Sequence, residues 1–133
     1  MSMSKILIML LLSNISVSSF AGWERIAGND EITIYIDKSS IRRDDVMVKV
    51  WLLDDYRDPQ KTSSSGEYLS SIDFLEFDCK AGRRRIHEFV LYSGYMGRGS
   101  PIFTSSSTPG SWSNSEVPGS IGKTLLTVAC QKK

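Results

Sequence analysis

Apolar residues recur at every second position through most of this chain, and this period of two is the feature that most restricts its fold. In the stretch 32–37 three isoleucines share one face, and in 46–56 Val46, Val48, Val50 and Leu52 do the same. A period of two is typical of β-strands, and β-branched residues suit a pleated, half-buried surface. Strands are therefore predicted at 23–27, 31–37, 46–56, 67–79, 83–92 and, as a short strand, 102–104.

The connections between these predicted strands are mostly short and polar. Neighbouring strands are therefore expected to run antiparallel, since parallel strands need long crossovers. Residues 38–45 are polar, and only Ile41 is expected to point inward. Residues 57–66 contain a proline, three consecutive serines and a glycine, which predicts an exposed hairpin loop. Residues 93–119 are rich in Ser, Gly and Pro, and beyond the short strand they are predicted to form a loop held down by Trp112.

One helix is predicted, close to the end of the sequence. Ser120 follows a Pro-Gly pair and is a suitable N-cap. One arc of this helix collects its apolar residues, which are Gly122, Leu125, Leu126, Ala129 and Cys130. The predicted fold class is α+β, an antiparallel β-sheet of about six strands with one C-terminal helix packed on one face.

Residues 1–21 have the three parts of a secretory signal peptide. Lys5 supplies the basic start, residues 6–12 the apolar run, and Ser19-Phe20-Ala21 a small-x-small end. A membrane anchor would need about 20 predominantly apolar residues, and here serines interrupt the run earlier. We predict cleavage after Ala21, which leaves a single exported domain, residues 22–133, in the periplasm or at the cell surface without a stable membrane anchor.

The charge of the predicted exported part is balanced. The whole chain has 16 basic and 15 acidic residues, and Lys5 is the only charged residue within 1–21. This balance argues against general binding of nucleic acid, which depends on clustered lysines and arginines. The expected partner is a protein, with an acidic polysaccharide as a further candidate at a local basic patch.

Two cysteines, Cys79 and Cys130, lie in the part that is predicted to be exported. Two thiols in an oxidising compartment have one intramolecular pairing, so a Cys79–Cys130 disulfide is predicted. This bond would attach the C-terminal helix to the end of the strand 67–79, with Leu75 and Phe77 beneath the helix. No metal site is expected, because zinc usually has four ligands and His87 is the only histidine. No cofactor is expected either.

No residue is predicted to be catalytic. His87 has no recognisable nucleophile partner, and no Gly-x-Ser-x-Gly motif surrounds any serine. Glycoside hydrolysis would need two carboxylates at a set separation, and the candidates are Asp54, Asp55, Asp73, Glu76 and Asp78. On a regular strand Asp73 and Glu76 face opposite sides, whereas Glu76 and Asp78 share the face that is predicted to point away from the helix.

Two segments are candidates for contact with a partner. In Arg83-Arg84-Arg85 the outer two side chains should project together and the middle one oppositely. Such charges either discourage pairing at a sheet edge or contact an acidic surface. The segment 92–99 holds Tyr95 and Arg98 among glycines, and is either a turn packed on the sheet or part of an interface. The candidate partner-binding residues are therefore Arg83, Arg85, Tyr95 and Arg98.

The order of several short motifs resembles that of the surface-adhesin protein E family of exported bacterial proteins. These motifs are Trp23, Tyr35-Ile36-Asp37, Ser40-Ile41-Arg42-Arg43, Val48-Lys49-Val50-Trp51, Asp55-Tyr56, Glu76-Phe77-Asp78-Cys79, Tyr92-Ser93-Gly94, Thr108-Pro109-Gly110-Ser111-Trp112, Pro118-Gly119-Ser120 and Cys130. The resemblance implies a six-stranded antiparallel sheet, a helix tethered by a disulfide, and binding of host matrix or serum proteins. It implies no catalytic residues. Members with a lipid anchor carry a cysteine at the cleavage point, where this chain has none.

Three functions follow as hypotheses. The first is a non-enzymatic binding protein that adheres to host matrix or serum proteins. The second is a periplasmic protein that caps another bacterial protein, or inhibits a secreted hydrolase such as lysozyme. The third is a cryptic hydrolase, whose turnover would disappear on His87→Ala substitution. The sequence favours no particular oligomeric state.

Overall fold

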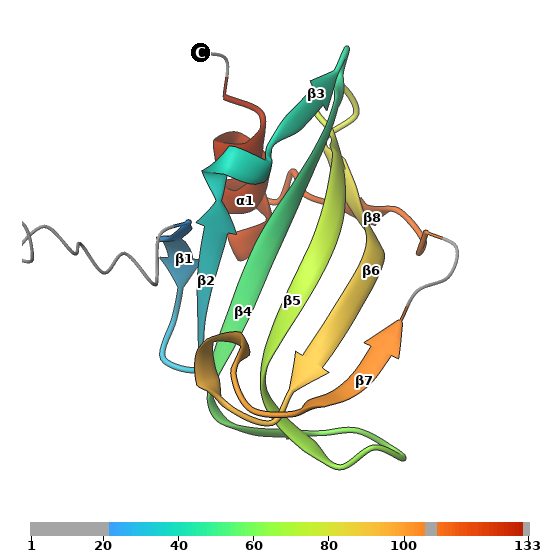
Figure 1. The fold of residues 1–133 in the computed structure, drawn as a ribbon. Coiled ribbons are helices and arrows are strands. Elements are labelled where there is room, and N and C mark those ends of the chain that lie inside the picture. Colours follow the sequence, from blue (N-terminus) through green and yellow to red (C-terminus); the bar gives the residue numbers. More distant parts are fainter. Residues whose placement is uncertain (1–21, 106–108, 132–133) are drawn as a thin grey trace, which may run out of the picture.

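The computed structural model describes residues 22–105 and 109–131, so the predicted signal peptide at 1–21 lies outside the described residues. Figure 1 shows one curved sheet with a helix behind it. The elements are β1 (Trp23–Gly28), β2 (Ile32–Asp37), the 3-10 turn η3 (Lys38–Ser40), β3 (Arg42–Asp44), β4 (Met47–Lys61), β5 (Glu67–Asp78), β6 (Arg83–Tyr92), the 3-10 turn η4 (Tyr95–Gly97), β7 (Pro101–Ser105), β8 (Ser113–Asn114) and α1 (Ile121–Ala129).

The strands form one antiparallel sheet whose six main strands follow the chain in the order β1-β2-β4-β5-β6-β7. This confirms the predicted α+β class and the main strands. Two further strands were not predicted: β3 pairs with β4, and β8 pairs with β6. They have three and two residues, too few to show an alternation of apolar and polar positions, so the sequence suggested only irregular backbone there.

The β4–β5 hairpin is longer than predicted. The prediction of a loop over 57–66 was wrong, because β4 continues to Lys61 and pairs there with Glu67, which leaves a loop of residues 62–66. Pro59 falls within an irregularity of the ladder between Asp55 and Gln60, a place where proline is tolerated in sheets. The N–H and the hydroxyl of Thr62 both donate to the carbonyl of Gly66 at 2.9 Å, which closes the loop.

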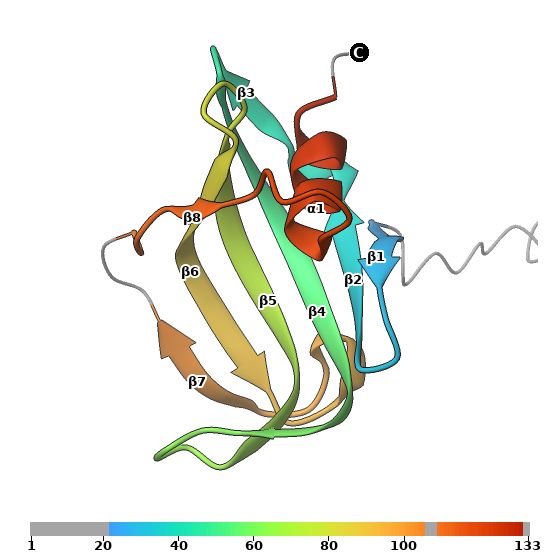
Figure 2. The same cartoon turned by 180° about the vertical axis from the view of Figure 1, so that it is seen from behind.

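The core lies between α1 and one face of the sheet (Figure 2). Alternate residues of β2, β4 and β5 supply the sheet side, and three residues of α1 supply the other side. Leu75 and Phe77 belong to this cluster, as predicted. Its buried members are Ile34, Ile36, Val48, Val50, Leu52, Leu75, Phe77, Leu125, Leu126 and Ala129.

Both ends of α1 are held as the sequence predicts. Ser120 Oγ accepts a hydrogen bond from the N–H of Lys123 at 3.1 Å, which caps the first turn. At the other end the Cys79–Cys130 disulfide is present, with the two Cα atoms 5.8 Å apart. Gly122 lets the helix approach the sheet, since a Cβ there would lie 2.5 Å from Arg84 Nη1. Within the described residues, no helix is long and apolar enough to cross a membrane.

Candidate functional site

The first two residues of interest, Arg83 and Arg85, lie at the start of β6 on the face of the sheet that α1 does not cover. We call this the open face. Arg84 projects to the other side, where its Nη1 donates to Ser115 Oγ at 2.7 Å and its side chain borders a cavity with Leu125 of α1. The predicted alternation of the three arginines is therefore confirmed.

Trp112 lies against both open-face arginines. The guanidinium carbons of Arg83 and Arg85 are each 4.3 Å from the centroid of the Trp112 ring. Cation–π contacts of this kind contribute about 0.5–1 kcal/mol each at exposed sites. They hold the segment that leads into β8 against the sheet, as the prediction of a loop held by Trp112 required. We call Arg83, Arg85 and Trp112 the Arg–Trp surface.

Each arginine of the Arg–Trp surface also has a carboxylate partner on β5. Arg83 Nε lies 3.1 Å from Asp78 Oδ2, and Arg85 Nε lies 2.7 Å from Glu76 Oε1. The side chains of Asp78 and Glu76 are only 9% and 8% exposed, whereas that of Arg83 is 42% exposed. The carboxylates therefore form the buried support, and the arginines form the accessible layer above it.

The pKa values of these two carboxyl groups are lowered. Burial alone would raise the pKa of Glu76, but hydrogen bonds from His87 and Arg85, together with their charges, outweigh burial and lower it. The pKa of Asp78 is lowered first by the hydrogen bond from the backbone N–H of Ala81, with Arg83 adding to the effect against burial. Both groups are therefore ionised near neutral pH and keep the arginines in place.

His87 belongs to the same network. Its Nε2 lies 3.0 Å from Glu76 Oε1, and its ring packs 5.9 Å from that of Phe74. Phe74 in turn packs against Trp51, with the two ring centroids 4.8 Å apart and the rings tilted by 33°. Among the described residues, the polar partner of His87 is this one carboxylate rather than a hydroxyl or a thiol, so the arrangement positions no nucleophile. No group of three or more potential metal ligands occurs in the described part of the chain.

Tyr95 and Arg98, the other two predicted partner-binding residues, lie at the opposite end of the open face. The Tyr95 hydroxyl donates to the carbonyl of Arg57 at 2.9 Å, and the side chain remains about half exposed. The adjacent N–H of Met96 donates to Asp55 Oδ1 at 2.7 Å. Along β5, six positions separate Glu76, which pairs with Arg85, from Ser70, whose Oγ accepts a hydrogen bond from the N–H of Gly97, a distance of about 20 Å at about 3.3 Å per residue. The four residues therefore do not form one site.

A pair of aspartates on the helix-covered face was not predicted as a pair. Asp54 and Asp73 are hydrogen-bonded to each other beside a cavity of about 180 Å³, which Arg84, Ile121 and Leu125 also border. Burial, followed by the charge of Asp54, raises the pKa of Asp73 to about 8. Burial also raises the pKa of Asp54, although Asp73 and Arg84 oppose this. The two groups therefore share a proton at neutral pH.

The aspartate pair does not have the geometry of a glycoside hydrolase. Such enzymes keep their two carboxyl groups about 5 Å or more apart, so that a sugar or a water fits between them, whereas Asp54 and Asp73 contact each other directly. Two tyrosines share this environment, and burial is the main cause that raises the pKa of both Tyr56 and Tyr68, with the aspartate charges adding to it. The alternation along each strand indicates which face each aspartate occupies. The contact between Asp54 and Asp73, however, can be predicted only when the pairing of β4 with β5 is known.

Comparison with known proteins gives one consistent match. The family model described as surface-adhesin protein E matches residues 23–131. A structure of Haemophilus influenzae protein E in its crystal form II is similar with a TM-score of 0.61 and 16% identity, and the match covers 83% of this chain and 87% of that chain. A structure of protein E from non-typeable Haemophilus influenzae has a TM-score of 0.58 at 16% identity, covering 87% and 78%. No curated protein sequence matches.

Proposed function

Since the chain belongs to the surface-adhesin protein E family, we propose that it is an exported, non-enzymatic binding protein that attaches to a host matrix or serum protein. The proposed contact is the Arg–Trp surface. Export agrees with the disulfide, because such bonds persist in oxidising compartments. The site is also balanced in charge and holds no positioned nucleophile, which favours binding over catalysis.

The observation that carries this proposal is the way in which Trp112 and the two arginines are held. Tryptophan and arginine, together with tyrosine, are the side chains most enriched in the hot spots of protein interfaces. Here both guanidinium groups are fixed by buried carboxylates and by a ring 4.3 Å away. A partner therefore meets side chains that are already ordered, and little conformational entropy is lost when it binds.

Binding to a panel of purified matrix and serum proteins tests the proposal. We expect saturable binding to at least one of them, weakened about tenfold or more by Trp112→Ala and by the double change Arg83→Ser, Arg85→Ser. Arg57→Ser is the matched control, because Arg57 is an exposed arginine paired with Asp58 near the other end of the sheet. The Arg57→Ser variant should bind with the same affinity as the unchanged protein.

Two outcomes contradict the proposal. Absence of saturable binding to every protein of the panel removes the adhesin function, and a pull-down from periplasm then tests the alternative of a bacterial partner. Equal loss of binding in the Arg57→Ser control removes the Arg–Trp surface as the contact. Protease added to intact cells tests display at the cell surface. If the protein is displayed there, it should be degraded while the cells remain intact.

A further inference from the structure

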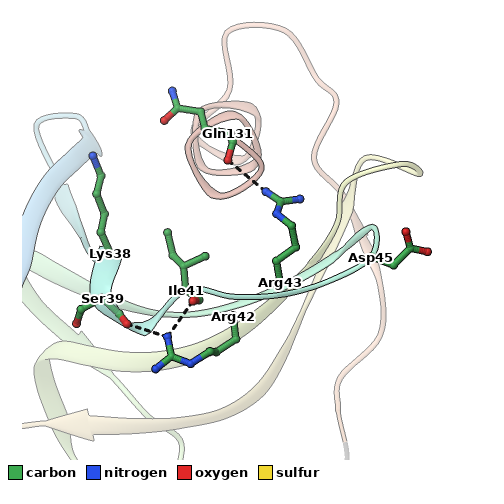
Figure 3. A pocket seen from close by; sticks show the side chains of 7 residues that line it. All are labelled: Lys38, Ser39, Ile41, Arg42, Arg43, Asp45 and Gln131. Carbon is green, nitrogen blue, oxygen red and sulfur yellow. Dashed lines mark hydrogen bonds between the residues drawn. The ribbon is translucent and has the colours of Figure 1, made fainter. Parts of the chain in front are cut away.

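A basic groove lies at the end of the molecule where α1 stops. It has a volume of about 600 Å³ and is bordered by Lys38 and Ser39 of η3, by Ile41, by the two arginines of β3 and by Gln131. Figure 3 shows Ile41 and Arg43 pointing toward the end of α1, while Arg42 lies on the other side of β3. Asp45, at the turn between β3 and β4, is the one acidic residue on its border among residues 22–105 and 109–131.

The two arginines of this groove are held by neutral acceptors. Arg42 Nη1 donates to the carbonyls of Ser39 and Ile41, each at 2.9 Å, and Arg43 Nη2 donates to the carbonyl of Gln131 at 3.2 Å. Neither has a carboxylate within ion-pair distance among the described residues, in contrast to Arg83 and Arg85. A guanidinium group has five N–H donors, so each arginine is fixed in place and still has donors and charge for a ligand.

Lys38 adds a third cation. Its Nζ lies 3.2 Å from Glu24 Oε2, but both side chains are more than half exposed. Exposed ion pairs of this kind contribute little to stability, because water and salt screen the two charges. An anionic ligand in the groove can therefore compete with Glu24 for the ammonium group at small cost.

The positive charge continues around the β3–β4 hairpin. Arg43 also borders two neighbouring cavities. The first, of about 190 Å³, is lined by Lys49 together with Asp44 and Glu76, and the second, of about 390 Å³, by Lys80 together with Asp45. The cations are thus spread along a surface rather than gathered at one point, which suits a chain with repeated anionic groups better than a single small anion.

We propose that this groove binds a sulfated polysaccharide. Arginine donates in a fork geometry that matches the paired oxygens of sulfate and carboxylate groups. Within the part of the chain that the structure describes, Ile41 is the one apolar side chain on the border of the groove. Peptides are usually anchored by several apolar pockets or by a longer strand edge than the three residues of β3. No aromatic side chain of the described residues borders the groove, so none of them stacks there on nucleic-acid bases.

Titration of the exported, disulfide-intact protein with heparin tests this site. We expect binding that weakens as NaCl is raised. The double change Arg42→Ser, Arg43→Ser should weaken it about tenfold, and should reduce the slope of log K against log salt by about two. Arg42→Lys with Arg43→Lys keeps both charges and should retain most of the affinity. Arg57→Ser with Lys61→Ser, two exposed cations from the far end of β4, should bind as the unchanged protein does.

Polyglutamate and duplex DNA of equal charge are the competing probes, and both should bind clearly more weakly than heparin. Equal affinity for polyglutamate would assign the groove to acidic peptides, and equal affinity for DNA would mean binding by charge alone. Unchanged heparin binding by the double serine variant, or an equal loss in the Arg57, Lys61 control, would also overturn the proposal. Arg42→Glu is a second variant that alters only a side chain bonded to local carbonyls, and it should lose affinity while its circular dichroism spectrum stays unchanged.

Discussion

Replacing Cys130 by serine should lower the free energy of unfolding by about 4 kcal/mol, because the disulfide closes a loop between residues that are 51 positions apart. A domain of this size is typically stable by about 5–15 kcal/mol, so this loss is a large part of the total. It should appear as a lower midpoint in urea under oxidising conditions. Trypsin should then cleave at Lys123 within α1, which the bond otherwise keeps on the sheet.

The unchanged protein treated with a reductant is the internal control for this prediction. Its stability should fall to that of the Cys130→Ser variant, and the variant itself should not respond to the reductant. An equal urea midpoint for the variant and the oxidised protein would contradict the role that we assign to the bond. Ser120→Ala, which removes only the cap at the other end of α1, should cost a smaller amount, about 1 kcal/mol.

Asp73→Asn should make the protein more stable at pH 8 and should remove most of the dependence of its stability on pH between about 5 and 8. The pKa of Asp73 is raised to about 8 in the folded protein, against about 3.9 in an unfolded chain. Between these values the folded state binds more protons than the unfolded state, so stability falls as the pH rises, by up to about 1.4 kcal/mol per pH unit. Asparagine keeps the shape of the side chain and cannot ionise.

Urea unfolding of both proteins at several pH values measures this effect. Asp58→Asn is the control, because Asp58 is an exposed aspartate, and its substitution should leave the slope of stability against pH unchanged. The same slope in Asp73→Asn as in the unchanged protein would contradict the shared proton. Glu76 and Asp78 act with the opposite sign, since their lowered pKa values give stability that is lost as the pH falls through those values in acid.

The main strands and the helix could be predicted because their residues repeat a pattern that depends only on the local chain. The isoleucines of β2 and the valines of β4 alternate over enough positions to indicate both a strand and its buried face. The start of α1 followed from Ser120, and the disulfide followed from the count of cysteines. The strands β3 and β8 are too short for such a pattern, and the extension of β4 past Pro59 depends on its pairing with β5.

The features of the candidate sites depend on contacts between distant segments, and the sequence predicted them only in part. Arg83 and Arg85 could be placed on one face from their spacing, but their shared contact with Trp112 requires the path of the chain through β8. The Asp54–Asp73 pair requires the register in which Leu52 lies opposite Asp73. The basic groove requires η3, β3 and the end of α1 to meet, which no local pattern of residues indicates.

The consecutive order of the main strands has a consequence for the way in which the chain folds. Each main strand after β4 pairs with the strand that precedes it in the chain, so the sheet can grow by hairpins, each of which closes only a short loop. Pairing of this kind avoids the long crossovers between strands that slow folding. α1 is the exception, since it has to return from beyond β8 to the strands at the centre of the sheet. Oxidation of Cys79 and Cys130, 51 positions apart, therefore makes permanent the return of α1 to the sheet, the step that we expect to be completed last.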